Sequence, residues 1–185
     1  MEKRKSPHLF TADVDFTDDV DFTGAVSFTG AVTRTGRELF SPAGDGVAGA
    51  TAGWVVTGAD DGLARLPVSQ TSSTLVVPLK GLAIGDIVTG VRAIGQVESA
   101  GANVTLVMSV RKATAVAGDF TDAEIGTANV GTLTADTLIS GTVLEVTGLT
   151  ETLIETEMLY VLLTGTTAAL TDIALSGFVV TTTTK

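Results

Sequence analysis

Hydrophobic and polar residues alternate with a fixed period near the start of the chain. Phenylalanine recurs every six residues from Phe10 to Phe28, and a valine follows each phenylalanine four positions later. Because six is a multiple of two, an extended chain places all these side chains on one face. Threonines and most of the acidic residues occupy the other face. Residues 10–33 therefore predict a β ribbon with one apolar and one polar face.

Such a ribbon needs a partner, because its row of Phe and Val would otherwise face water. A single-chain left-handed β-helix takes about three hexapeptides per coil and several stacked coils, so four copies of the repeat are too few. We expect three copies of the chain to wrap around a shared axis over residues 10–35, as a β stalk. The alternative is an edge ribbon on the chain's own head. The expected trimerisation residues are Phe10, Val14, Phe16, Val20, Phe22, Val26, Phe28 and Val32.

The hydrophobic pattern changes after the repeat. Residues 36–53 are rich in glycine, with Pro42 among them, which predicts a linker that Leu39 and Phe40 anchor on a neighbouring surface. From Trp54 onward, short apolar runs alternate with turn signals, which is typical of an antiparallel β-sandwich or jelly-roll head over residues 54–185. The predicted fold class is therefore all-β. The chain divides into four parts: a basic N-terminal segment (1–9), the stalk (10–35), the glycine-rich linker (36–53) and the β-sandwich head (54–185).

Several elements of the head are predicted individually. Residues 87–98 and 103–112 predict the two strands of a hairpin, whereas residues 119–125 predict a single helical turn. Residues 150–157 predict an acidic loop, and residues 158–164 a strand buried on both faces. Further strands are expected at 127–138, at 142–147 and at 173–182, the last with a bulge at Gly177.

The net charge and the composition exclude several classes of partner and site. The net charge is −10, which argues against nucleic acid as a partner, because phosphates require basic patches. The chain has no cysteine, so disulfides and cysteine–zinc sites are excluded. No apolar run approaches the length of a membrane helix, and the start of the chain lacks the apolar core of a signal peptide. We expect no membrane insertion, no cofactor and synthesis in a cytoplasm.

The first residues differ in charge from the rest. Lys3, Arg4 and Lys5 form a basic group on an otherwise acidic chain. This group is a candidate anchor into an acidic socket of a larger assembly. The alternative is a solvated terminus.

Candidate catalytic chemistry is sparse. The only histidine is His8, so Ser–His–Asp and Cys–His arrangements are unavailable. Paired carboxylates could act as in a glycosidase, and the candidates are Glu145, Glu151, Glu155 and Glu157. Their spacing selects no pair, and few aromatic residues are available to line a sugar groove. We therefore expect the protein not to be an enzyme.

The repeat also carries an acidic cluster. Its members are Asp13, Asp15, Asp18, Asp19 and Asp21. Three chains would bring rings of carboxylates together, which could bind a cation such as Ca²⁺. The alternative is a solvated face that deters edge pairing. Asp18 is the exception, because its even position places it on the apolar face.

Together these features resemble a family of proteins. The Phe-Thr-Gly-Ala-Val hexapeptide stalk, the glycine-rich neck and the Thr/Val/Gly-rich head, including residues 75–90, 97–101 and 178–180, are similar to trimeric structural proteins of tailed bacteriophages. Head-decoration proteins, head fibres and small tail spikes are the nearest types. The resemblance implies a homotrimer in the virion, attached at one end to a major capsid or tail protein, with a β-sandwich knob at the other.

Three functions follow from this resemblance and from the residues. The first is a non-enzymatic decoration or projection of the capsid that stabilises it or aids adsorption. The second is a knob that binds a host receptor or host-surface glycan. The third is a glycosidase that uses Glu155 or Glu157.

Overall fold

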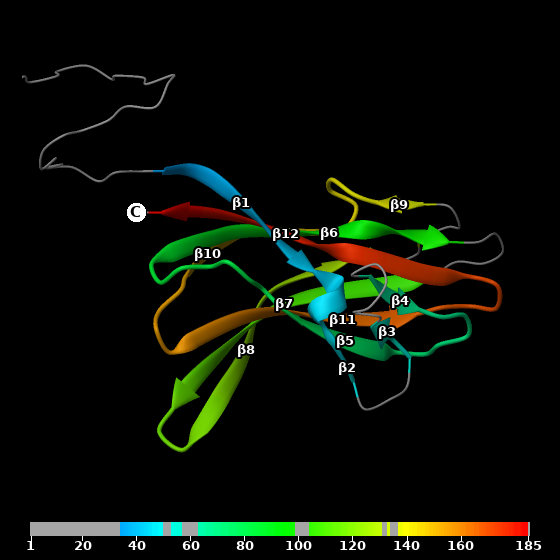
Figure 1. Cartoon of the computed structure of the whole chain (residues 1–185), viewed down its shortest axis with the longest axis horizontal. Helices are drawn as coiled ribbons and strands as arrows, with labels where there is room; N and C mark the ends of the chain where they lie inside the picture. The colour runs from blue at the N-terminus through cyan, green and yellow to red at the C-terminus, as the bar shows by residue number, and fades with distance from the viewer. Residues whose placement is uncertain are drawn as a thin grey trace, which may run out of the picture. The chain divides into compact units, whose positions relative to one another are not determined.

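The described part of the chain is a two-layer β structure. The computed structural model describes residues 34–49, 53–56, 63–98, 104–130, 133 and 137–184. Its contacts divide the chain into two units, 1–31 and 32–185, and all described residues belong to the second. This unit consists of two antiparallel sheets (Figure 1). The predicted all-β sandwich is confirmed at this level, whereas the stalk lies outside the described residues.

The larger sheet is built on two long central strands, β6 (Asp86–Glu98) and β12 (Asp172–Thr184), which pair along most of their length. On the far side of β6 lie β10 (Glu145–Thr152) and β9 (Leu138–Ile139). On the far side of β12 lie β1 (Arg34–Pro42) and β4 (Ala64–Leu66), with β3 (Val55–Val56) beyond β4. A 3-10 turn, η1 (Ala43–Asp45), follows β1.

The smaller sheet has five strands. Their order across the sheet is β2 (Val47–Ala48), β5 (Ser73–Pro78), β11 (Glu157–Thr166), β7 (Thr105–Val116) and β8 (Asp119–Asn129). β8 is an edge strand, and it pairs with β7 around a turn at Gly118, where φ is +85°. A positive φ is readily adopted by glycine, which explains the tight connection.

The hydrophobic core lies between the two sheets. Alternate residues of β5 and β11 are buried there, including Leu75, Val77, Val161 and Leu163. They face the buried side chains of β6 and β12, among which Phe178 is fully buried. Burying a large apolar side chain gains about 1.5–3 kcal/mol, so this interface between the layers stabilises the unit.

The predicted hairpin of residues 87–98 and 103–112 is wrong. Both segments are strands, but β6 lies in the larger sheet and β7 in the smaller one. β6 pairs with β12, whereas β7 pairs with β11 and β8. β6 and β7, consecutive along the chain, therefore lie in different layers. The prediction failed because alternation along a strand does not specify its partner.

The predicted linker over residues 36–53 is also wrong for its described part. β1 pairs with β12 from Arg34 to Pro42. Arg37 fixes β1 further, because its Nη2 lies 2.9 Å from Oδ2 of the buried Asp86. Leu39 packs on the core as expected, whereas Phe40 is about half exposed. Of the glycines that suggested a linker, Gly36 lies within β1 and Gly44 within η1, and Gly46 and Gly49 flank β2.

Three smaller expectations can be compared directly. Residues 119–125 form part of β8 and not a helical turn. The predicted acidic loop at 150–157 is shorter than expected, because β10 continues to Thr152 and β11 begins at Glu157. β11 is buried on one face only, since its alternate residues are partly exposed. The bulge at Gly177 is confirmed by a register shift between Leu175 and Gly177 in β12.

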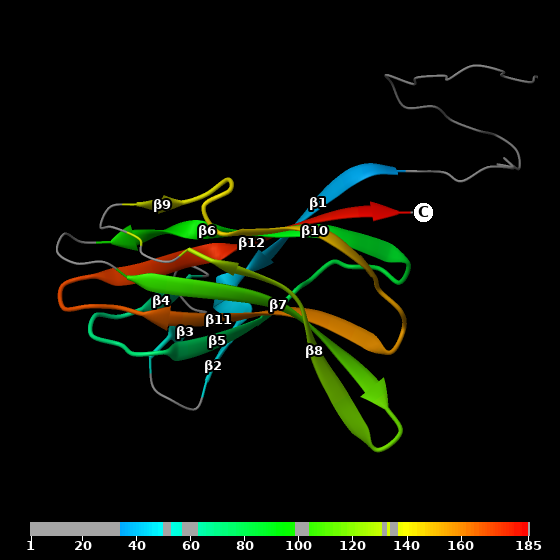
Figure 2. The same cartoon turned by 180° about the vertical axis from the view of Figure 1, so that it is seen from behind.

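The paired ends of β7 and β8 extend away from the sandwich, as both views show (Figures 1 and 2). We call residues 113–124 the arm. Residues 115–124 of the arm are exposed, in contrast to the neighbouring part of β7.

Candidate functional site

The residues with the clearest predicted roles lie outside the described part of the chain. This holds for the trimerisation residues Phe10, Val14, Phe16, Val20, Phe22, Val26, Phe28 and Val32. It also holds for the basic group Lys3, Arg4 and Lys5 and for the acidic cluster Asp13, Asp15, Asp18, Asp19 and Asp21. Their roles stay predictions. Within the described residues, two surface hollows and two ion-pair clusters are the candidate functional features.

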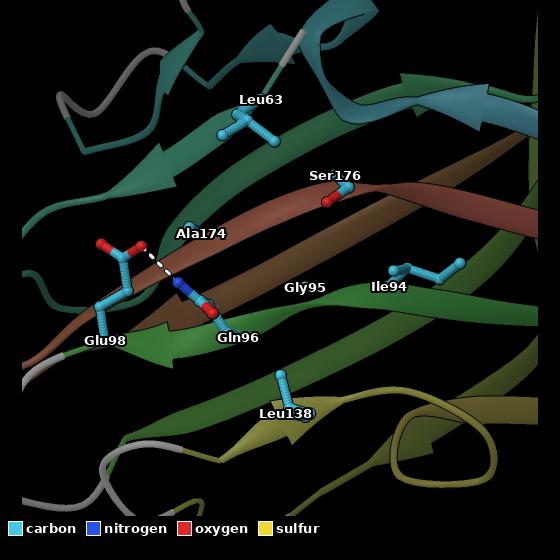
Figure 3. A pocket seen from close by; sticks show the side chains of 8 residues that line it. All are labelled: Leu63, Ile94, Gly95, Gln96, Glu98, Leu138, Ala174 and Ser176. Atoms are coloured by element: carbon cyan, nitrogen blue, oxygen red, sulfur yellow. Dashed lines mark hydrogen bonds between the residues drawn. The ribbon is translucent and has the colours of Figure 1, made fainter. Parts of the chain in front are cut away.

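The first hollow lies on the outer face of the larger sheet (Figure 3), and we call it the sheet-face hollow. Its volume is about 340 Å³. Leu63 and Leu138 lie on opposite sides of it: in Figure 3, Leu63 is above β12 and Leu138 is below β6. The other lining residues are Ile94, Gly95, Gln96, Glu98, Ala174 and Ser176.

Small residues make this hollow possible. Gly95 and Ala174 lie on the two central strands, so the sheet there carries little side-chain volume. At Gly95, a Cβ atom would lie 2.3 Å from the carbonyl oxygen of Ala174. Glycine is therefore required for β6 and β12 to approach each other at this point.

The polar edge of the sheet-face hollow is a short chain of interactions. Gln96 Nε2 donates to Glu98 Oε1 at 2.5 Å (Figure 3). The other carboxylate oxygen of Glu98 accepts from Arg65 Nη1 at 2.7 Å. This edge offers hydrogen-bonding groups beside apolar walls, a combination suited to a small polar ligand. It contains no nucleophile with an adjacent base.

The second hollow lies at the base of the arm, and we call it the arm hollow. It is an open depression of about 610 Å³. Its lining residues are Ala113, Ala115, Phe120, Glu155, Thr156, Glu157 and Met158. Phe120 is 72% exposed and Met158 50% exposed, so a large apolar surface faces solvent here.

An ion pair beside the arm hollow links three strands on the outer face of the smaller sheet. Arg111 on β7 binds Asp122 on β8, with Nη2 2.7 Å from Oδ2. Tyr160 on β11 donates its hydroxyl to Oδ1 of Asp122 at 2.7 Å. The hydrogen bond from Arg111, followed by that from Tyr160, lowers the pKa of Asp122 below its ordinary value of 3.8.

The other partners of this cluster respond in the opposite sense. Burial, and then the hydrogen bond to Asp122, raises the pKa of Tyr160 above its ordinary value of 10.0. Hydrogen bonding to Asp122 also raises the pKa of the Arg111 guanidinium. These shifts stabilise the charged guanidinium of Arg111 and the neutral phenol of Tyr160. The cluster therefore holds the base of the arm together, and its groups are not suited to proton transfer at neutral pH.

The fold brings two of the four predicted carboxylate candidates, Glu151 and Glu157, together around Lys112. Lys112 Nζ lies 2.5 Å from Oε1 of Glu151 and 3.1 Å from Oε1 of Glu157. Glu155 is exposed in the loop that joins β10 to β11, and Glu145 lies opposite Arg92 in the register of β10 with β6, where the Arg92 side chain binds Glu38. The hydrogen bonds that Lys112 donates to Glu151, and then to Glu157, raise its pKa. Glu151 and Glu157 thus share one ammonium group, which is the arrangement of a structural ion-pair cluster and not of the separate acid and nucleophile of a glycosidase.

Sequence reasoning did not identify the Arg111 and Lys112 clusters. Both residues stand next to each other on β7, so their side chains point to opposite faces. Their acidic partners lie 11 to 45 positions further along the chain: Asp122, Glu151 and Glu157. The alternation of side chains along a strand indicates that residues 111 and 112 face opposite sides. It does not indicate which acidic residues they bind.

The described residues offer no metal site of protein ligands, because no group of three or more His, Cys, Asp or Glu side chains comes together among them. A search of the same residues finds no helix that is long and apolar enough to cross a membrane.

Comparison with known proteins returns little. No protein-family model and no curated protein matches the sequence. Among solved structures, the chain is similar to the CBM22-1–GH10 modules of xylanase 10B from Clostridium thermocellum, a structure complexed with xylohexaose. The identity is 14% and the TM-score 0.40, over 80% of this chain and 28% of the xylanase chain. A similarity this low carries no argument about this chain.

Proposed function

We propose that the protein is a non-enzymatic structural protein of a phage virion, a homotrimer that decorates or projects from the capsid. The observation that carries this proposal is the hexapeptide repeat of residues 10–33, whose Phe and Val all fall on one face. Burial of each such side chain gains about 1.5–3 kcal/mol. Eight of them per chain are sufficient to hold three copies together.

The fold of the second unit supports this architecture. β1 begins at Arg34, immediately after the repeat, and pairs with β12 at the centre of the larger sheet. Each repeat is therefore followed directly by a β-sandwich head, with no long linker between them. Such a head, with its charges largely engaged in local ion pairs, is suited to a passive surface role.

The attachment to the particle completes the proposal. Lys3, Arg4 and Lys5 would anchor the trimer to an acidic socket on a major capsid or tail protein. The acidic residues of the repeat other than Asp18 would form its solvated outer face. Binding to the particle would occur through the repeat end and leave the heads to project.

The trimer is tested by light scattering on the full chain. The wild type should have three times the chain mass of 18.8 kDa. Phe22→Asp places a charge on the apolar face and should give monomers or aggregates, whereas Thr23→Asp, on the polar face, should leave the trimer intact. A wild-type monomer, or an intact Phe22→Asp trimer, would overturn the proposal.

The decoration role is tested separately. The protein should bind purified capsids and raise their thermal stability, and the triple variant Lys3→Glu, Arg4→Glu, Lys5→Glu should lose this binding while remaining a trimer. No effect of the wild type on capsids would contradict decoration.

A second candidate function is recognition of a host-surface glycan. The sheet-face hollow favours it, since apolar walls lie beside the hydrogen-bonding groups of Gln96 and Glu98. In this case the protein should bind host cells and block infection. Ala174→Trp, which fills the hollow, should abolish cell binding without changing the oligomeric mass.

A further inference from the structure

The arm exposes apolar side chains in a way that a solvated hairpin does not. Phe120 is the most exposed large hydrophobic residue of the described chain, at 72%. Val116 and Met158 are also about half exposed. Residues 113–120 contain three alanines, one valine and one phenylalanine but a single charged residue, Asp119. Their composition is that of a buried or covered segment.

The arm also lacks support from the rest of its own sheet. β11 begins at Glu157, opposite Thr114, so it covers β7 only up to that point. One further hydrogen bond, from the amide of Ala115 to the carbonyl of Thr156, closes this contact at 2.9 Å. Beyond it, β7 and β8 pair only with each other. A two-stranded ribbon is marginally stable in water, so a partner on the arm would stabilise it.

Both faces of this ribbon carry apolar side chains. Phe120 pairs with Ala115, and Val116 pairs with Asp119, the next position along. Neighbouring pairs point to opposite faces of a ribbon, so Phe120 and Val116 project on opposite sides. A partner that touches only one face would leave the other exposed. Contact from two sides is what a threefold arrangement provides to each of its members.

The arm lies at the end of the sandwich to which the repeat is joined. Arg34, the first residue of β1, is opposite Thr184, and Thr184 is opposite Asp86. The carbonyl of Asp86 accepts from the amide of Leu153 at 2.9 Å. The connection from Leu153 to Thr156 then leads to Ala115. Both views show the start of β1, the end of β12 and the arm at this one end (Figures 1 and 2).

This location decides which partner is nearest. Three chains joined through residues 10–35 would be tethered at the arm end of each head. Ile84 and Ile154, in the loops at the same end, add further exposed apolar surface. Arg34 and the arm belong to different sheets, and the connection from Leu153 to Thr156 links the two layers at this end. The arm of another copy would therefore be an apolar surface held at the same end.

The charges of the arm permit such a contact. The arm, residues 113–124, carries three acidic and no basic side chains, and Arg111 and Lys112 precede it on β7. Asp122 is already paired with Arg111 at 2.7 Å, and Glu124 lies 3.9 Å from the same guanidinium. Arg111 therefore compensates part of the charge of the arm, whereas Lys112 is engaged by Glu151 and Glu157. The repulsion that remains between apposed arms acts between exposed charges, which salt screens.

We infer that the arm is a second contact between copies of this chain, in which Phe120, Val116 and Met158 of one head pack against the arm of the next. This inference rests on the proposed trimer. It adds that the heads are joined to each other and do not swing independently on the repeat.

Hydrogen exchange of the full-length protein tests this contact. The amides of residues 115–124 should exchange at least about tenfold faster in Phe120→Glu than in the wild type. Leu138→Glu is the matched control, because Leu138 is 66% exposed and lies on β9, away from the arm. The control should leave exchange in the arm unchanged. Both variants should remain trimers by light scattering, because the repeat is intact.

The outcomes separate the two proposals. If all three proteins are trimers and the arm exchanges equally fast in each, the arm contact is overturned while the trimer stands. Protection of the arm that arises only on addition of purified capsids would also overturn it, because the arm would then contact the particle. A monomeric wild type would overturn the trimer, and the arm contact with it.

A cysteine crosslink provides a second measurement that does not depend on tolerance of Phe120→Glu. The natural chain has no cysteine, so a single introduced thiol is unambiguous. Ala117→Cys, in the turn of the arm, should give a crosslinked dimer on mild oxidation. Ala169→Cys, between β11 and β12 at the opposite end, should not. Equal crosslinking of the two variants would contradict the contact.

Discussion

Two pairs of long antiparallel strands in this protein have similar lengths and opposite environments. β6 and β12 pair at the centre of the larger sheet, and their inner faces are buried by the smaller sheet. β7 and β8 pair over a comparable length, but residues 115–124 of this pair are exposed. The same secondary structure is thus a core in one place and a projection in the other.

The difference comes from the second layer and not from strand character. β6 and β12 have neighbours on both edges and a facing sheet. The outer part of β7 has β8 alone, because β11 begins opposite Thr114. Packing against another layer is what makes a strand stable, so the arm should be the least protected strand pair of an isolated head.

The largest effect is expected in the core pair. Phe178→Ala removes a fully buried ring from β12 and should lower the free energy of unfolding by about 3–5 kcal/mol in urea denaturation. Phe120→Ala on the arm should change the unfolding of the head by no more than about 0.5 kcal/mol. Measurements at two protein concentrations would separate unfolding from association. Equal losses for both variants would contradict the contrast between the two pairs.

An intermediate effect is expected at the base of the arm. Lys112→Met leaves Glu157, whose side chain is only 7% exposed, without its cation and near Glu151. The free energy of unfolding should fall by about 2–3 kcal/mol, because breaking a largely buried ion pair leaves the remaining charge without a partner. Lys80→Met removes the exposed pair with Asp45 and should cost less than about 1 kcal/mol. Urea denaturation at neutral pH compares the two variants. A smaller loss of stability for Lys112→Met than for Lys80→Met would show that the base of the arm does not contribute to the stability of the core.

The smallest effect is expected in the dependence of the arm on pH. The pKa of Asp122 is lowered in the folded state, mainly by Arg111. Its stabilising contribution is therefore present above the ordinary pKa of 3.8 and is lost as the pH falls through the lowered value.

Asp122→Asn should remove this acid-dependent loss. The melting temperature of the wild type should fall more steeply below about pH 4 than that of the variant. Asp119→Asn removes an acid from the same arm without touching Arg111, and it should retain the wild-type dependence. Parallel curves for wild type and Asp122→Asn would show that the cluster does not stabilise the arm.

Much of the strand content was accessible from the sequence. The run at 158–164 predicted β11, and the run at 173–182 predicted β12 with its bulge at Gly177. Short apolar runs with β-branched residues have few alternatives to a strand. Composition misled at β1, where nearby glycines and Pro42 suggested a linker. Residues 119–125 likewise predicted a helical turn, where the structure has part of β8.

The candidate sites were accessible only in part. The sheet-face hollow depends on Gly95 of β6 and Ala174 of β12, which are neighbours only because these strands pair. The arm hollow likewise requires Met158 to lie beside Ala113. No pattern within either segment indicates these neighbours.

By itself, the sequence determines that this chain is all-β, that it carries a one-faced repeat, and that it has neither cysteine nor a histidine outside position 8. Only the tertiary structure decides that β6 pairs with β12 and not with β7, and that Lys112 meets Glu151 and Glu157. The physical reason is that alternation specifies which face of a strand is apolar, and every possible partner strand satisfies it equally. The choice among partners comes from packing the two layers, which no single segment encodes.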